Sequence, residues 1–153
     1  MVHVQFRAGP KAARAARMSF ARLTERVPRR ASEDARLLIS ELVTNCVRHA
    51  GLGPNDVIDL RMAIREDVLR VEVRDRGPGF EPRVKPPTVY QVSGWGLFLV
   101  DRIADRWGVS SEGATCVWFE LRLGRQGLKD RPVHRSKQVR GSISPEGVQG
   151  IPV

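Results

Sequence analysis

Polar and apolar positions in the first 50 residues follow one strand-like and two helix-like patterns. Residues 3–6 alternate between polar and apolar side chains, which predicts a short edge strand. Between Pro10 and Pro28 the apolar residues recur every three or four positions, so we expect one continuous helix there. A second helix is predicted over residues 32–50, with Ser32 as its N-cap.

Two hairpins and a further helix are predicted in the next part of the chain. Alternation over residues 58–73 is interrupted by Glu66-Asp67, which supplies a turn between two antiparallel strands. Residues 81–93 are rich in proline and have no period, so we expect a long loop of the kind that often forms a functional lid. A helix is predicted to follow this loop, and residues 107–123 form a final hairpin.

Length and composition set the number of domains. The chain has 153 residues, 41% of them hydrophobic, which is enough for one core and too little for two full domains. We therefore expect one domain over residues 1–124. Residues 125–153 are rich in basic residues, have few large apolar side chains and follow no period, which predicts a disordered C-terminal tail.

Several classes of protein are disfavoured by composition. No run of about 18 apolar residues is present, and the segment from Met1 to Pro10 lacks the core of a signal peptide, so we expect a cytoplasmic protein without a membrane segment. Cys46 and Cys116 lie far apart in apolar segments, which predicts buried, reduced thiols. The three histidines are too scattered to predict a metal site.

The net charge of +9 would suit a nucleic-acid-binding protein, since Lys and Arg neutralise phosphates. Much of the excess lies in the first predicted helix and after Leu123, without the interleaved aromatic residues of a base-stacking surface. Direct nucleic-acid binding therefore stays a minor alternative.

A polar stripe on the second predicted helix is the first candidate site. Glu41, Asn45 and His49 are spaced four apart and so share one side of the helix. A stripe of this kind is often only a solvent-facing surface, and spacing alone leaves that alternative open. An Asn amide oxygen also suits Mg²⁺, and a nearby Glu can deprotonate a hydroxyl, so the pair is compatible with phosphoryl transfer.

Two glycine motifs complete the candidate site. Asp75-Arg-Gly77-Pro-Gly79-Phe80 follows a predicted strand, where the glycines let a ligand approach the main chain and Asp75 can accept a hydrogen bond from an exocyclic amine. An ordinary strand-ending turn would use the same residue types. Gly94-Trp95-Gly96-Leu97 opens a predicted helix, whose unpaired N–H groups are suited to phosphates.

The order of these motifs resembles the GHKL ATPases: an N box from Glu41 to Ala50, a first glycine box from Asp75 to Phe80 and a second from Gly94. The resemblance covers residues 10–123 and is strongest to the anti-sigma-factor serine/threonine kinases of actinobacterial type. It implies an α+β fold, a two-layer α/β sandwich in which a mixed, mostly antiparallel sheet packs on about three helices.

The resemblance also implies roles for individual residues. Asn45 would bind Mg²⁺, Glu41 would act as the catalytic base or orient water, and Asp75 would read the adenine amine. The other residues implied in nucleotide binding are His49, Gly77, Gly79, Phe80, Gly94, Trp95, Gly96, Leu97 and Thr115.

Two positions depart from the family pattern. Ala114 is inserted before Thr115, whose hydroxyl we expect to reach Asp75 or the adenine through water. Cys46 stands where alanine is usual, which we interpret as a packing change.

The function implied is an ATP- and Mg²⁺-dependent kinase that binds a sigma factor and phosphorylates an anti-sigma-factor antagonist on serine or threonine. The alternative is an ATP-gated binding module without phosphate transfer. A sensor histidine kinase is disfavoured, because the sequence has no phosphoacceptor-histidine hairpin ahead of the N box. A homodimer is compatible with the resemblance.

Overall fold

The structure, a computed structural model, describes residues 1–77, 95–110 and 114–124. The predicted loop over residues 81–93 and the predicted tail over residues 125–153 lie outside the described residues. The elements in chain order are β1 (Val2–Arg7), α1 (Ala12–Phe20), the 3₁₀ helix η1 (Ala21–Arg26), α2 (Arg29–His49), β2 (Val57–Arg65), β3 (Val68–Asp75), α3 (Trp95–Ile103), β4 (Arg106–Ser110) and β5 (Thr115–Arg122).

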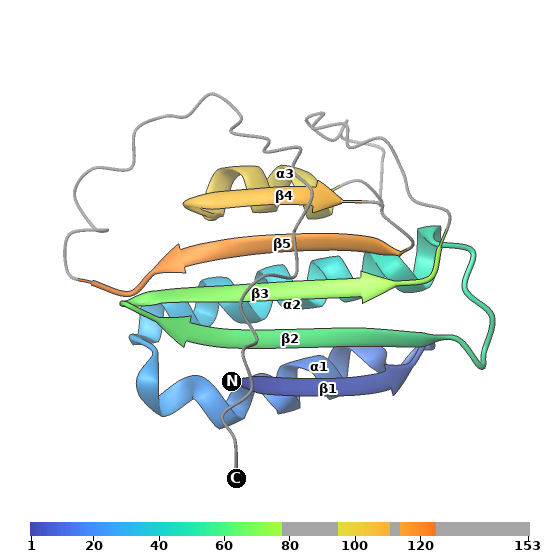
Figure 1. Cartoon of the computed structure of the whole chain (residues 1–153), viewed down its shortest axis with the longest axis horizontal. Helices are drawn as coiled ribbons and strands as arrows, with labels where there is room; N and C mark the ends of the chain where they lie inside the picture. Colours follow the sequence, from blue (N-terminus) through green and yellow to red (C-terminus); the bar gives the residue numbers. More distant parts are fainter. Residues whose placement is uncertain (78–94, 111–113, 125–153) are drawn as a thin grey trace, which may run out of the picture.

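The strands form one five-stranded sheet in the order β1-β2-β3-β5-β4. Figure 1 shows α1, α2 and α3 on the same face of this sheet, behind the strands in that view. The predicted α+β class and its two layers are therefore confirmed. Where the prediction allowed a mixed sheet, the described strands pair only antiparallel, because the chain returns through β4 before β5 pairs with β3.

The turn between β2 and β3 uses the two residues predicted from the sequence. Glu66 and Asp67 have φ values of 46° and 60°, and Arg65 pairs directly with Val68. Two successive left-handed residues are typical of the type I′ turn, whose twist matches that of the flanking strands. The Asp67 carbonyl also accepts a hydrogen bond of 2.7 Å from the amide of Leu123, so the turn is tied to the end of β5.

The N-terminal helical segment differs from the prediction in two ways. The continuous helix expected between Pro10 and Pro28 is divided into α1 and η1, and the chain is extended at Val27. The second helix, α2, begins at Arg29, because Pro28 supplies a fixed φ of −54° ahead of the first turn. Ser32 is therefore not the N-cap: it is buried in the first turn, and its amide donates to the Pro28 carbonyl at 2.9 Å. None of the helices in the described ranges is long and apolar enough to cross a membrane.

A hydrophobic core lies between the helices and the sheet. Its largest fully buried side chains include Phe20, Leu38, Ile39, Leu42 and Phe119. Cys46 belongs to this core, whereas Cys116 is buried on the other face of β5, because side chains alternate along a strand and Val117 faces the core. Both cysteines are buried and free of disulfides, as predicted.

Candidate functional site

Three elements meet where the predicted site residues lie: the last turns of α2, the end of β3 and the first turn of α3. Gly77, just beyond β3, approaches α2 so closely that a Cβ there would be 2.8 Å from the carbonyl oxygen of Ala50. The same Cβ would be 2.8 Å from Oδ1 of Asp75. A side chain at Gly77 would therefore have to displace backbone, which explains why the sequence has glycine at this position.

The end of β3 presents a buried carboxylate. Asp75 is only 5% exposed, and its Oδ1 accepts a hydrogen bond of 2.8 Å from the amide of Gly77. Thr115 pairs with Asp75 in the β3–β5 register and is also buried. Its hydroxyl donates to the Gly77 carbonyl at 3.2 Å. The expected contact of this hydroxyl with Asp75 or the adenine through water stays a prediction. The amide and the carbonyl of Gly77 are thus both hydrogen-bonded to neighbouring side chains.

Cys46 lies in the hydrophobic core on the same helix as the polar stripe. Burial raises the pKa of the Cys46 thiol, and the negative charge of Asp75 and a hydrogen bond to its carboxylate raise that pKa further. The thiol is therefore protonated at neutral pH.

The polar stripe of α2 contacts the first turn of α3. A Cβ on Gly96 would overlap the side-chain amide nitrogen of Asn45, so the Asn45 amide occupies the space that the missing side chain leaves. Gly96 is itself buried. The N box and the second glycine box, which the sequence separates by about 50 positions, are therefore in direct contact. The alternative of a purely solvent-facing stripe is wrong for Asn45.

Glu41 and His49 extend the same stripe one turn to either side of Asn45. Glu41 is half-buried, whereas His49, at the end of α2, is exposed. The first turn of α3 lies beside Asn45. The arrangement places the Asn45 amide next to a helix N-terminus, and the Glu41 carboxylate lies one turn earlier on the same side of α2.

Two side chains outside the predicted site hold α3 in place. Trp107 on β4 donates its indole N–H to the Asp101 carboxylate of α3 at 3.0 Å. The Asp105 carboxylate accepts the amide of Arg122 at 2.7 Å, so the connection after α3 is fixed to β5. The structural role of these two acidic residues could not be read from their spacing in the sequence.

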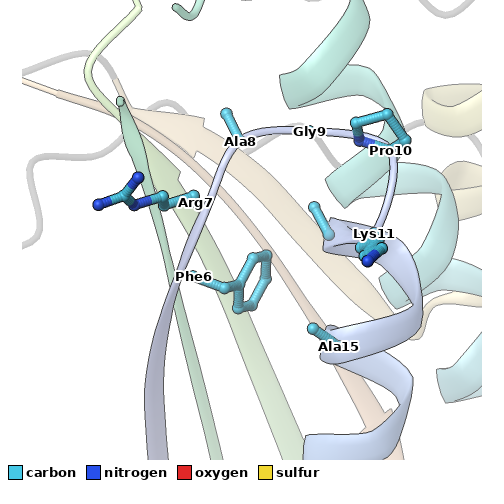
Figure 2. Close-up of a pocket in the computed structure, with 8 residues that line it drawn as sticks. Phe6, Arg7, Ala8, Gly9, Pro10, Lys11 and Ala15 are labelled. Carbon is cyan, nitrogen blue, oxygen red and sulfur yellow. The ribbon is translucent and has the colours of Figure 1, made fainter. Parts of the chain in front are cut away.

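A pocket of about 370 Å³ lies at the β1 edge of the sheet, between the end of β1 and the start of α1. Figure 2 shows Phe6 on the strand side and Ala15 on the helix side, with Pro10 in the turn that joins them. None of the predicted nucleotide residues lines this pocket. It is therefore separate from the site formed by α2, β3 and α3.

A comparison with models of protein families shows which family this chain belongs to. The model of the histidine kinase-like ATPase domain matches residues 6–121. The chain belongs to this family. The match includes all the described elements that form the site.

Curated relatives of this ATPase-family chain include proteins named serine-protein kinase RsbW. The protein from Listeria monocytogenes serotype 4a (strain HCC23) is 32% identical over 87 residues, with 49% of this chain and 55% of that protein covered. The protein from Staphylococcus aureus (strain bovine RF122 / ET3-1) is 31% identical over 98 residues, with 56% of this chain and 62% of that protein covered. The chain thus spans less than two thirds of the length of these relatives.

The fold of the family is also found among solved structures. The catalytic domain of the histidine kinase ThkA has a TM-score of 0.50 and 16% sequence identity, with 80% of this chain and 97% of that chain covered. This likeness confirms the predicted fold and carries no information about substrate.

Some predicted site residues of this ATPase domain lie outside the described residues: Gly79, Phe80 and Gly94. Trp95 begins α3, but its side chain is not among the described parts. Leu97 is partly buried and packs against the core. Roles for these residues in nucleotide binding stay predictions.

The side chains at this site suit a magnesium ion that is coordinated by phosphate oxygens as well as by protein. They suit a metal coordinated by protein ligands alone less well. In the described ranges no three His, Cys, Asp or Glu residues cluster closely enough to hold a metal. Mg²⁺ accepts a single hard oxygen ligand from protein and completes its octahedron with water and phosphate oxygens. The Asn45 amide at the α3 N-terminus provides that kind of ligand.

Proposed function

We propose that this ATPase-family domain binds Mg-ATP at the junction of α2, β3 and α3 and transfers the γ-phosphate to a serine or threonine of a partner protein. The observation that carries the proposal is the contact between Asn45 and Gly96, which joins a magnesium-type ligand to a helix N-terminus. The buried Asp75 at the end of β3 provides a second anchor.

Asp75 would bind the adenine. An ionised carboxylate only accepts hydrogen bonds, so it favours a base that donates an exocyclic amine. Because Asp75 is almost completely buried, water competes weakly for that hydrogen bond. Gly77 has no side chain and would let the base lie against the main chain.

The phosphates would lie at the N-terminus of α3. The backbone N–H groups at a helix N-terminus and the positive end of the helix dipole favour anions. Asn45 would hold the Mg²⁺, which neutralises charge on the β- and γ-phosphates when bound. The hydrogen bond from Trp107 to Asp101 keeps α3 against the sheet and so maintains the position of these N–H groups.

Glu41 would act as the base for transfer. The partner hydroxyl loses its proton to the Glu41 carboxylate as its oxygen bonds to the γ-phosphorus. The bond from that phosphorus to the β–γ bridging oxygen breaks, and ADP leaves. Glu41 lies one helical turn from Asn45, on the side of α2 that faces α3.

The names of the relatives support protein phosphorylation, since they are called serine-protein kinases. Following the resemblance to anti-sigma-factor kinases, we extend the proposal to a cytoplasmic enzyme that binds a sigma factor and phosphorylates its antagonist. We also propose, on the same resemblance, that the protein forms a homodimer.

A binding module without phosphate transfer is the second candidate, and the outer face of α1 and α2 favours it. Met18 and Leu37 are 65% and 42% exposed there, next to exposed arginines that include Arg17 and Arg36. A basic surface with exposed apolar side chains suits an acidic protein partner.

Transfer of label from ATP separates the two candidates. We expect the wild-type protein, with γ-labelled ATP, Mg²⁺ and an antagonist protein encoded in the same genome, to label the antagonist on serine or threonine. A chelator should abolish that labelling. If ATP binds but no protein is ever labelled, the kinase proposal is wrong and the binding module is favoured.

A further inference from the structure

The face of the sheet that points away from the helices is lined with arginine. Leu69, Val71 and Val73 of β3 belong to the core, so the residues between them point outward. The same alternation holds in β2, β4 and β5. We call this surface the arginine face; its charged side chains on these four strands are Arg61, Arg65, Arg70, Arg74, Arg106, Arg122, Asp59, Glu72 and Glu120.

The carboxylates of the arginine face lie beneath its guanidinium groups. Each carboxylate pairs with arginine at N–O distances between 2.8 and 3.5 Å. The carboxylate side chains are only 15–16% exposed, whereas those of the paired arginines are 31–57% exposed. The pairs are Arg61–Asp59, Arg70–Glu72, Arg74–Glu72, Arg70–Glu120 and Arg106–Glu120. Guanidinium groups therefore form the outer surface.

The paired arginines keep hydrogen-bond donors for a ligand. A guanidinium has five N–H groups, and the hydrogen bonds of Arg61, Arg70 and Arg74 to the carboxylates use one or two of them in each side chain. Because the carboxylates already fix these side chains, a ligand does not have to order them on binding. The guanidinium fork matches the two oxygens of a carboxylate or a phosphate, so the arginine face suits an anionic ligand.

The aromatic residue of the arginine face favours carboxylates over nucleic acid. Trp118 points outward from β5 but is only 6% exposed, and the guanidinium carbon of Arg70 lies 4.1 Å from the centre of its ring. A nucleotide base cannot stack on a ring that is covered in this way. Figure 1 shows α1, α2 and α3 on the opposite side of the sheet, so no described helix could enter a groove of duplex DNA from this face.

Charge disfavours two occupants that the protein itself could supply. Residues 125–153 contain six Lys and Arg residues against two acidic residues, and a second copy of the chain would carry a net charge of +9. The arginine face has six arginines against three carboxylates on β2 to β5, so it would repel both.

We propose that the arginine face binds an extended, acidic segment of a partner protein. In an extended chain, side chains at every second position point to the same side, so Asp or Glu at alternate positions would direct a row of carboxylates at the guanidinium groups. This surface goes beyond the proposed function, since it lies on the other side of the sheet from α1 and α2 and requires no nucleotide.

The test measures fluorescence anisotropy of a labelled peptide in which Glu alternates with Ser, at physiological ionic strength. The double variant Arg65→Glu/Arg106→Glu reverses two exposed charges on the arginine face. Arg22→Glu/Arg26→Glu is the matched control, because it changes the net charge equally at exposed positions on η1. Arg65→Gln/Arg106→Gln removes the charges without placing a carboxylate beside Glu120, and circular dichroism shows whether each variant is folded.

We expect the wild type to bind the peptide, the glutamate variant of the arginine face to bind it about ten-fold more weakly and the glutamine variant about three-fold more weakly. The η1 control should bind as the wild type does. No binding by the wild type, no loss in the two variants of the arginine face, or an equal loss in the control would overturn the proposal.

Two other anions are tested with the same variants: a thymidylate oligonucleotide and vesicles that contain phosphatidylserine. Tighter binding of either probe than of the peptide, lost in the variants of the arginine face, would overturn the acidic segment as the ligand and assign this face to phosphates. ATP binding should be equal in all variants, because none of the changed residues belongs to the proposed nucleotide site. Failure of this proposal would therefore leave the nucleotide site standing.

Discussion

Replacement of Gly96 by alanine is expected to weaken Mg-ATP binding about 10- to 100-fold while the protein stays folded. The new Cβ would occupy the position of the Asn45 amide nitrogen. Asn45 has a short side chain that can rotate away without moving backbone, so the fold tolerates the change. Rotation removes the amide from the α3 N-terminus, where we propose it holds Mg²⁺. Calorimetric titration with ATP and Mg²⁺ measures the loss.

Gly9→Ala is the matched control for this substitution. A Cβ at Gly9 has no neighbour within 4 Å, so binding and thermal stability should be close to those of the wild type. The account is contradicted if Gly96→Ala binds Mg-ATP as tightly as the wild type. A large fall in the melting temperature of Gly96→Ala would show that Asn45 cannot rotate and that the contact is mainly structural.

Glu41→Gln is expected to lower phosphate transfer to a partner protein about 100-fold or more while ATP affinity is retained. Glutamine keeps the shape of the side chain and cannot accept the hydroxyl proton. Glu41 is half-buried in α2, one turn before Asn45, and no described contact makes it part of the fold. Single-turnover transfer of labelled γ-phosphate, at saturating ATP, isolates the chemical step from binding.

Glu33→Gln controls for the loss of a negative charge on α2. Glu33 is exposed and pairs with Arg29 at 3.0 Å, one turn apart in the first part of the helix. A surface pair of this kind contributes little to stability, so transfer should be unchanged. Full transfer by Glu41→Gln would refute the assignment of Glu41 as the base and leave the nucleotide site intact.

Local signals in the sequence were sufficient for the hairpins and for the polar stripe. Glu66-Asp67 interrupts an alternating pattern, and a two-residue left-handed turn forms there. The spacing of Glu41 and Asn45 placed both on one side of α2, because helical periodicity is set by the backbone. These features depend on residues close together in the chain.

The start of α2 and the contacts that depend on long-range packing were predicted poorly. Ser32 has the residue type of an N-cap. Because Pro28 fixes the backbone ahead of Arg29, α2 begins at Arg29 and Ser32 lies inside its first turn. The hydroxyl of Thr115 reaches the Gly77 carbonyl, a partner set by the β3–β5 register. The approach of Ala50 to Gly77 likewise joins the end of α2 to the end of β3, and no local pattern encodes it.

The central claim is that the junction of α2, β3 and α3 is a Mg-ATP site, and calorimetric titration of ATP with and without Mg²⁺ tests it most directly. The wild type should show saturable binding that Mg²⁺ strengthens. Asn45→Ala should lose the Mg²⁺-dependent part of the affinity, and Asp75→Asn should lose the preference for adenine together with most of the binding. The account would be contradicted if the wild type did not bind ATP. It would also be contradicted if both variants bound ATP as tightly as the wild type.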